Sequence, residues 1–279
     1  MTAFLEIMDI ATGTAETLLQ TEAHIEAPNW APSGDHLIVN AAGRAYRVLL
    51  DAPALQEIDT GGLVQLNNDK ALSPDGRWLA ISDKTETGKS CIYTLPAGGG
   101  VPERITMQVP SWFHGWSPDG ARLVYTCVRD GAFGLASIAE AGGDETLLIR
   151  SAHHYDGPDY TPDGAFIWFN SDRGGGMDLW RMKADGSAPE RMTDGPEVDW
   201  FPHPSPDGKH VLYLAYPAGT EGHPFGLPVA LKLMPAAGGA ARTLTTIFGG
   251  QGALNVPPWA PDSRRFAYVR YSETHKTET

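Results

Sequence analysis

A four-residue turn sequence recurs six times along this chain and constrains its fold more than any other feature. Its clearest copy is Ser-Pro-Asp-Gly at residues 117–120, and five further copies, two of them degenerate, lie on either side. The prolines of the six copies are Pro32, Pro74, Pro118, Pro162, Pro206 and Pro261. Successive prolines are therefore 42, 44, 44, 44 and 55 residues apart. A period of this length is typical of proteins built from repeated structural units.

Each copy predicts a tight turn between two strands. Ser, Pro, Asp and Gly occupy the four positions at which a type I turn prefers them. A short run rich in β-branched and aromatic residues follows each turn, as in Leu123–Val128 and Phe166–Phe169. Such runs are typical of buried strands, so the turn is expected to join an antiparallel pair.

The remainder of each period also repeats. A third strand ending in a glycine-rich turn is expected at 92–99 and a short fourth strand at 103–106, with counterparts in the later periods. No stretch of the sequence combines a sustained helical period with helix caps. Four-stranded antiparallel units at this spacing predict the blades of a β-propeller.

The two ends of the chain are expected to share one blade. Residues 5–10 and 16–19 look like the third and fourth strands of a unit, whereas the C-terminal part supplies a first strand ending at Trp259 and a second strand at Phe266–Tyr271. The sequence therefore predicts an all-β fold: a single domain, 1–279, that forms a six-bladed β-propeller with four antiparallel strands per blade. Pairing of the N-terminal and C-terminal strands closes the ring and gives both of them partners.

The charge of the chain argues against some classes of partner. The formal net charge is −13 and there is no basic run. Nucleic acids and anionic membranes attract clustered Lys and Arg, so neither is expected to bind, and no segment is long enough for membrane insertion. Residues 1–10 lack the basic and apolar regions of a signal peptide. We expect a monomer, cytoplasmic if the chain is complete and periplasmic if a leader has been removed.

The irregular connections between the blades are the expected functional site. If the first strand of each unit is innermost, the segments that enter these strands converge on the mouth of the central channel, where functional loops on a rigid scaffold are expected. An insertion at 216–228, in the fifth unit, lies on the same face and is expected to act as a partial lid. The residues expected to bind a ligand or partner at the mouth are His24, Asn68, Trp112, His114, His154, Tyr155, Asp156, Asp199, Trp200, His203, Gln251 and Asn255.

Histidines at the mouth suggest a metal site as one hypothesis. Imidazoles from different blades, together with glutamine or carboxylate, suit Zn, Mn or Fe, and the candidate ligands are His114, His154 and His203. No local spacing of a metal-binding motif supports them, so this hypothesis depends on the fold. The alternative is that these imidazoles form hydrogen bonds with backbone groups at the blade junctions.

Neighbouring carboxylates suggest acid–base chemistry as a second hypothesis. Asp156 with Asp159, or Glu197 with Asp199, would shift each other's pKa if they were held close together. The alternative is that these are solvated loop carboxylates or side chains that cap turns.

Aromatic side chains suggest a recognition surface as a third hypothesis. Trp112, Tyr155 and Trp200 are candidate anchors for a peptide or a saccharide, because large aromatic residues dominate many binding sites. The alternative is that they pack between blades.

The repeated unit resembles a known family. Trp116 followed by Ser-Pro-Asp-Gly, with Leu-Trp-Arg-Met-Lys-Ala-Asp-Gly-Ser at 179–187 and Glu-Arg-Met-Thr at 190–193, resembles the TolB-like, WD40-like (PD40) β-propeller repeat. The C-terminal domain of TolB is a six-bladed propeller that docks a partner lipoprotein in the periplasm. Related repeats form the gating propeller of prolyl-oligopeptidase-type peptidases, and the similar oligogalacturonate lyases hold a metal with His and Gln at the mouth.

The sequence and the resemblance together favour a non-enzymatic binding propeller. Its channel mouth is expected to recognise a protein segment, a small molecule or a saccharide, and no cofactor is expected. The alternative is a metal-dependent lyase or hydrolase that acts on an oligosaccharide and uses a divalent transition metal at a His-rich mouth.

Overall fold

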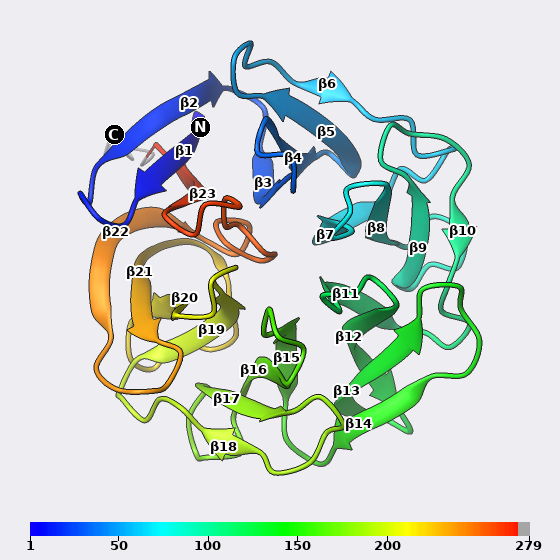
Figure 1. Ribbon diagram of the computed structural model, residues 1–279, viewed down its shortest axis with the longest axis vertical. Helices are drawn as coiled ribbons and strands as arrows, with labels where there is room; N and C mark the ends of the chain where they lie inside the picture. Colours follow the sequence, from blue (N-terminus) through cyan, green and yellow to red (C-terminus); the bar gives the residue numbers. More distant parts are fainter. Residues whose placement is uncertain (273–279) are drawn as a thin grey trace, which may run out of the picture.

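Six antiparallel sheets surround a central channel in the computed structural model, which describes residues 1–272 (Figure 1). Blade 1 consists of β3 (Ile25–Trp30), β4 (His36–Ala41), β5 (Arg44–Leu49) and β6 (Gln56–Glu57). Blade 2 consists of β7 (Leu66–Leu72), β8 (Trp78–Asp83), β9 (Cys91–Pro96) and β10 (Glu103–Arg104). In both blades the strands pair in chain order, as predicted, and the first strand lies next to the channel.

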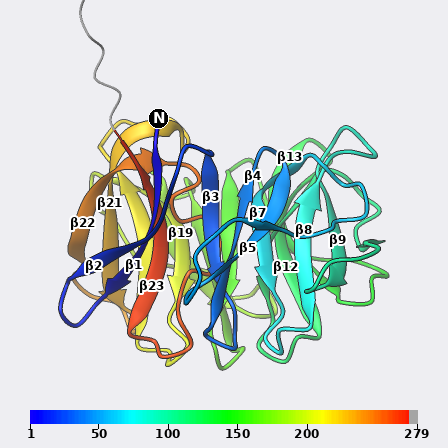
Figure 2. The ribbon, with the colours of Figure 1, turned by 90° about the horizontal axis from the view of Figure 1, so that it is seen from above.

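The next three blades repeat this order. Blade 3 consists of β11 (Ser111–Trp116), β12 (Arg122–Arg129), β13 (Ala132–Ala139) and β14 (Thr146–Arg150). Blade 4 consists of β15 (Tyr155–Tyr160), β16 (Phe166–Ser171), β17 (Asp178–Lys183) and β18 (Glu190–Arg191). Blade 5 consists of β19 (Val198–Pro204), β20 (His210–Tyr216), β21 (Phe225–Pro235) and β22 (Arg242–Gly250). Seen from the side, the strands run roughly along the channel, so the loops gather on two opposite faces (Figure 2).

Blade 6 confirms that the two chain ends close the ring. It consists of β1 (Ala3–Asp9), β2 (Ala15–Thr21) and β23 (Arg265–Tyr271). The register of β1 with β23 runs continuously from Ala3 opposite Tyr271 to Asp9 opposite Arg265. The predicted first strand of this blade is reduced to an isolated bridge between Trp259 and Phe266. Pro257 and Pro258 precede it, and because proline lacks the backbone N–H, a regular strand cannot form there.

The repeated turns have the predicted geometry. In the copy at 73–76, the Gly76 backbone N–H donates to the Ser73 carbonyl at 2.8 Å. Gly76 has φ of 71°, a left-handed conformation that glycine adopts without strain. The Ser73 hydroxyl donates to Asp75 at 2.7 Å and accepts the backbone N–H of Trp78 at 3.0 Å. Serine and aspartate therefore satisfy the turn locally, which explains why this sequence repeats.

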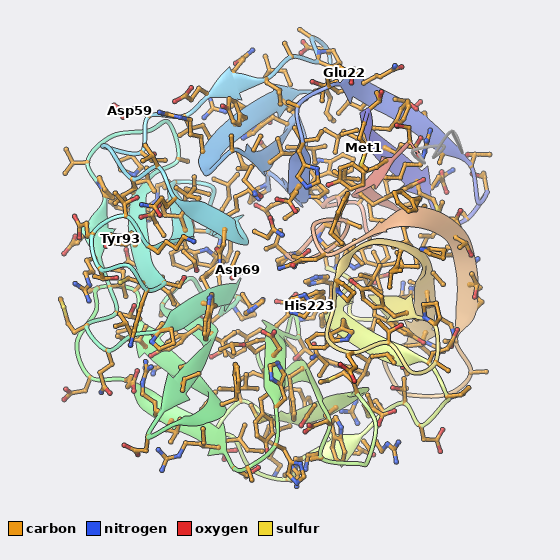
Figure 3. All side chains as sticks on the ribbon, turned by 180° about the vertical axis from the view of Figure 1, so that it is seen from behind. Met1, Glu22, Asp59, Asp69, Tyr93 and His223 are labelled. Carbon is orange, nitrogen blue, oxygen red and sulfur yellow. The ribbon has the colours of Figure 1, made fainter. Side chains whose placement is uncertain are left out.

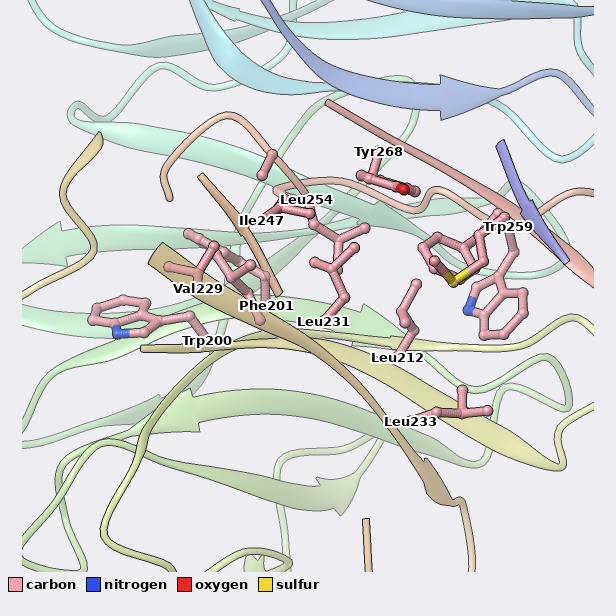
Figure 4. Close-up of a cluster of buried hydrophobic side chains, with 14 of the residues drawn as sticks. Trp200, Phe201, Leu212, Val229, Leu231, Leu233, Ile247, Leu254, Trp259 and Tyr268 are labelled. Atoms are coloured by element: carbon pink, nitrogen blue, oxygen red, sulfur yellow. The ribbon is translucent and has the colours of Figure 1, made fainter. Parts of the chain in front are cut away.

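The core lies between neighbouring blades. Figure 4 shows the cluster between blades 5 and 6, in which Leu212, Leu231 and Leu254 are fully buried. Trp200 lies at one end of this cluster and Trp259 at the other. Each such layer removes apolar surface from water, so the blades form one rigid ring around the channel. No helix in residues 1–272 has the length and apolar character of a membrane span.

Candidate functional site

A β-bulge interrupts the innermost strand of each of the five complete blades. The register shifts lie between Glu26 and Asn29 in β3, Leu66 and Lys70 in β7, Phe113 and Gly115 in β11, Asp156 and Asp159 in β15, and Trp200 and His203 in β19. A bulge changes the direction in which nearby side chains point and is common next to functional sites. Here it turns side chains that would alternate between blade faces toward the channel.

A cavity of about 470 Å³ occupies the mouth of the channel. Blades 1 to 5 contribute to its wall through the bulged strands, β12, β13, the loop before β15 and the loop between β20 and β21. The segment after β22, which leads into blade 6, completes the wall. Figure 3 shows Asp69 and His223 close to the central opening. The lining residues are Glu26, Asn67, Asn68, Asp69, Trp112, His114, Thr126, Phe133, His154, Asp156, Phe201, His223, Gln251 and Asn255.

Asp156 lies among three imidazoles. Its Oδ1 atom lies 3.0 Å from Nε2 of His114 and also accepts the hydroxyl of Thr126 at 2.9 Å. Its Oδ2 atom lies 3.6 Å from Nε2 of His154 and 3.8 Å from Nε2 of His223. Burial alone would raise the pKa of Asp156, but the neighbouring imidazoles outweigh burial and hold that pKa well below its usual range. Asp156 is therefore ionised and anchors this side of the cavity.

Asp69 is a buried carboxylate with few partners. Its Oδ2 atom accepts the side-chain N–H of Asn67 at 2.5 Å, and its backbone N–H donates to Asn67 at 3.1 Å. Burial raises the pKa of Asp69 to about 6, although the charge of His114 opposes the rise. A carboxylate that titrates near neutrality in a cavity is a common mark of a functional site.

A buried polar network links Glu26 to Lys70. The side chain of Asn68 donates to Glu26 at 3.3 Å and accepts from Asn40 at 2.9 Å. The ammonium of Lys70 donates to Asn40 at 2.6 Å and to the Ala27 carbonyl at 2.7 Å. Burial lowers the pKa of Lys70 to about 7. Lys70 does not line the cavity but holds Asn40 and the Ala27 carbonyl behind its wall by hydrogen bonds.

Aromatic rings cover another part of the wall. Trp112 stacks on Phe133 with ring centroids 6.3 Å apart, and Phe133 lies 4.2 Å from His154. His114 stacks on Phe201 with ring centroids 6.2 Å apart, and Phe201 lies 5.2 Å from His223. The cavity therefore combines ionised, amide and aromatic surfaces, a mixture typical of ligand sites.

Seven of the twelve residues expected at the mouth line this cavity. They are Asn68, Trp112, His114, His154, Asp156, Gln251 and Asn255. An eighth, His24, lies beside the cavity: its ring stacks on Tyr271 at 4.8 Å, and its Nε2 atom is 3.5 Å from Glu26.

The other four expected residues lie in the blades behind the cavity. Tyr155 is buried in the core of blade 4, and its hydroxyl pairs with Ser151. His203 is buried and lies 3.1 Å from Asp159. Asp199 is buried, and burial raises its pKa to about 6. Trp200 belongs to the core but also lines a second cavity of about 580 Å³, which shares His154 and His223 with the first.

The structure separates the three histidines that were candidate metal ligands. His114 and His154 both approach Asp156, whereas His203 faces Asp159. Within residues 1–272, no group of three or more His, Cys, Asp or Glu side chains has the arrangement of a metal site. Of the carboxylate pairs, Asp156 and Asp159 contact different imidazoles, those of His114 and His203. Glu197 pairs with Lys232, and its charge also contributes to the raised pKa of Asp199.

Sequence reasoning left several lining residues out of the expected set. The cavity-lining residues outside that set are Glu26, Asn67, Asp69, Thr126, Phe133, Phe201 and His223. The position of several of these residues within the repeat is the signal that could have identified them. Glu26, Asp69, His114, Asp156 and Phe201 all precede the proline of their turn by four to six residues. Aligning the inner strands on that proline would have identified the bulge positions. His223 belongs to the insertion that was expected to act as a lid.

The chain is similar to an uncharacterized protein of Agrobacterium fabrum. The two are 47% identical over 272 residues, which cover 97% of this chain and 93% of the relative. It is also 26% identical over 256 residues to the Tol-Pal system protein TolB of Francisella tularensis, covering 88% of this chain and 56% of that protein. The chain thus spans about half the length of the curated TolB relatives that it matches.

Solved structures show the same fold. A TolB candidate from Agrobacterium tumefaciens has a TM-score of 0.96 and 46% identity, covering 98% of this chain and 99% of that one. TolB of Acinetobacter baumannii has a TM-score of 0.70 at 18% identity, covering 90% of this chain and 64% of the other. An oligogalacturonate lyase in complex with manganese has a TM-score of 0.60 at 15% identity, covering 88% of this chain and 74% of the lyase chain. The last two likenesses show the fold alone.

The family model of the TolB β-propeller domain, PD40, matches residues 111–248, which contain the complete repeats of blades 3 and 4 and almost all of blade 5. This match confirms the resemblance of the repeated turns, and the TolB candidate of known structure is similar over 98% of the chain. The chain belongs to the TolB-like (PD40) β-propeller family.

Proposed function

We propose that this protein is a non-enzymatic binding propeller that captures a small polar ligand, or one side chain of a protein segment, in its mouth cavity. The observation that carries the proposal is the convergence of side chains from five blades, and from the segment that leads into the sixth, on one cavity of about 470 Å³. A cavity of this size with mixed polar and aromatic lining suits a small ligand. The name of the TolB relatives, Tol-Pal system protein, supports a protein segment as one source of the captured group.

The loop at 217–224 supports capture over simple surface contact. His223 closes one side of the cavity and lies 4.4 Å from Trp200 and 5.2 Å from Phe201, measured between ring centroids. Blades 1 to 4 supply rigid walls, because their lining residues lie on or beside paired strands. A cavity whose wall is built mainly on paired strands, with loops at its edge, admits a ligand with little reorganisation of the ring.

Binding of a small probe panel tests the proposal. The panel consists of n-butylammonium, n-butanol, butyrate and glucose. Binding of each probe is measured by ligand-observed NMR with the wild-type protein and with two variants. Gln251→Trp fills the cavity without removing a hydrogen bond of the native side chain, and Gln20→Trp is the matched control on the exposed outer strand β2. We expect at least one probe to bind the wild type and Gln20→Trp, and to lose binding in Gln251→Trp. Equal behaviour of all three proteins toward every probe would reject the cavity as a binding site.

A metal-dependent lyase or hydrolase acting on an oligosaccharide is the second candidate. One observation favours it: the imidazoles of His114, His154 and His223 all approach Asp156. Metal analysis of the purified protein separates the two candidates. A near-stoichiometric transition metal that disappears in His114→Ala would favour the enzyme, whereas the binding propeller is expected to carry none.

A further inference from the structure

Two carboxylate oxygens at the cavity accept no hydrogen bond from the part of the chain that the structure describes. Asp69 is only 7% exposed, and its single side-chain partner, Asn67, occupies Oδ2 and leaves Oδ1 free. Asp156 uses Oδ1 for His114, Thr126 and the backbone of Gly157, whereas Oδ2 has imidazole nitrogens only at 3.6 and 3.8 Å. Both oxygens face the cavity rather than the closed interior of the protein, so a donor that enters the cavity can reach them.

The cavity wall does not supply that donor as a lysine or arginine. Neither residue type is among the residues that line the cavity. Lys70 is the nearby buried amine, and its Nζ atom already donates to Asn40 and the Ala27 carbonyl. The imidazole of His114 lies against Asp156 and also interacts with the charge of Asp69, so these two carboxylates share one imidazole, while His24 lies 3.5 Å from Glu26. The whole chain has a formal net charge of −13, which further favours the approach of a cation.

The aromatic wall suits the same kind of ligand. The stacked pair of Trp112 and Phe133 and the ring of Phe201 all line the cavity. The faces of aromatic rings attract cations, and the attraction increases where water is excluded. The side-chain oxygen of Gln251, in the segment after β22, adds a neutral acceptor to the wall, whereas that of Asn255 already accepts the backbone N–H of Gly252 at 2.6 Å.

We infer that the group captured in the mouth cavity is an organic cation, a protonated alkylamine or guanidinium, held by Asp69 and Asp156 against the aromatic wall. This inference rests on the proposed function and specifies its ligand. A volume of about 470 Å³ exceeds what one metal ion needs, and residues 1–272 offer no preformed cluster of metal ligands. The second cavity, beyond His154 and His223, leaves room for the chain that carries the cation.

Calorimetric titrations at pH 7.5 test the inference. The probes are n-butylammonium, its neutral and anionic analogues n-butanol and butyrate, and Ca²⁺ as an inorganic cation for comparison. A five-residue glycine peptide with a central lysine, and the same peptide with norleucine, distinguish a protein side chain from a free amine. The variants are Asp69→Asn, which keeps the shape of the side chain, the cavity-filling Gln251→Trp, and the exposed control Asp144→Asn.

We expect n-butylammonium to bind about tenfold more tightly than n-butanol. Asp69→Asn should weaken the binding of n-butylammonium by about the same factor, because the bound ammonium loses its carboxylate partner. Asp144→Asn should match the wild type. A lysine peptide that binds more tightly than n-butylammonium, while its norleucine analogue does not bind, would identify a protein segment as the source of the cation.

Other outcomes would overturn the inference. If n-butanol or butyrate binds at least as tightly as n-butylammonium and depends on Gln251, the cavity is a binding site but not one for cations. If Ca²⁺ alone binds and depends on Asp69, the ligand is inorganic. If no probe distinguishes the wild type from Gln251→Trp, the proposed function fails together with the inference.

Discussion

Nε2 of His114 lies 3.0 Å from Oδ1 of Asp156, and this contact joins the innermost strands of blades 3 and 4 at the channel mouth. Burial opposes the charged imidazolium, but Asp69, Asp156 and Asp159 outweigh burial and raise the pKa of His114. The same contact lowers the pKa of Asp156. Folding therefore favours the charged forms of both His114 and Asp156, and the stabilising effect of the pair depends on pH.

Replacing His114 with Gln should destabilise the protein more in acid than in base. Because the pKa of His114 is raised in the folded state, its contribution is complete below the ordinary value of 6.5 and is lost as the pH rises through the folded pKa. We expect a loss of about 3 kcal/mol in the free energy of unfolding at pH 6 and a smaller loss at pH 9.

Urea unfolding of His114→Gln, Asp156→Asn and the double variant at both pH values measures this effect. The coupling between the two substitutions should be clear at pH 6 and weak at pH 9. A coupling of equal size at the two pH values would show that the contact does not depend on a protonated His114.

Replacing Asp69 with Asn should stabilise the protein at alkaline pH. Burial raises the pKa of Asp69 from 3.8 to about 6, so its contribution to stability is full below pH 3.8 and is lost as the pH rises through about 6. Above that range the buried charge is unfavourable, and Asn removes it. We expect Asp69→Asn to gain about 2 kcal/mol in unfolding free energy at pH 8 relative to its effect at pH 4.5.

Asp83→Asn in the same blade is the matched control for this prediction. Asp83 is also buried, but it accepts the backbone N–H groups of Gln65 at 2.8 Å and Thr85 at 2.6 Å. Its replacement should therefore destabilise the protein. If Asp69→Asn lost stability at pH 8 as Asp83→Asn does, Asp69 would be a structural side chain and its place in a ligand site would be contradicted.

Replacing Glu6 with Gln should weaken the closure of the ring. Glu6 lies on β1, accepts the hydroxyl of Tyr268 at 2.5 Å and lies 2.7 Å from the guanidinium of Arg270, both on β23. We expect Glu6→Gln to lose about 2 kcal/mol in unfolding free energy because these charge-assisted bonds join the two chain ends. The control is Glu16→Gln on the exposed strand β2. Equal midpoints of denaturation for the two variants would argue against this role of Glu6.

Replacing His223 with Ala should reduce ligand affinity without unfolding the ring. Burial lowers the pKa of His223, so the side chain is neutral at pH 7.5 and acts as part of the wall. We expect the His223→Ala variant to bind n-butylammonium several-fold more weakly, about threefold to tenfold, because one side of the cavity is opened. The exposed neighbour Glu221→Ala is the control, and a melting temperature equal to that of the wild type should accompany both. A matching affinity in the two variants would place His223 outside the site.

The fold could be predicted from the sequence because every blade repeats the same local chemistry. The turn that begins at Ser73 satisfies its own hydrogen bonds, so its conformation depends little on distant parts of the chain. Ring closure could also be predicted, since two half-blades need partners and β1 pairs with β23 over its whole length. The reduced first strand of blade 6 was not expected, although Pro257 and Pro258 are visible in the sequence.

The site could be predicted only in part, because side-chain direction depends on the bulges. Even alternation along β15 would place Asp156 and Asp159 on opposite faces, whereas the bulge between them changes this register, and the first contacts His114 while the second contacts His203. Trp200 was expected at the mouth and lies mainly in the core, since the bulge in β19 presents Phe201 instead. Such shifts of one residue are not encoded in the polarity pattern.

The most direct test of the ligand cavity is a two-dimensional NMR titration of the tryptophan indole N–H groups with n-butylammonium. Trp112 lines the cavity, whereas Trp78 is 37% exposed outside it. We expect the Trp112 signal to shift saturably in the wild type and to stay fixed in Gln251→Trp, with Trp78 unchanged in both. A Trp112 signal that does not move, or that moves equally in Gln251→Trp, would contradict a cation site at the channel mouth.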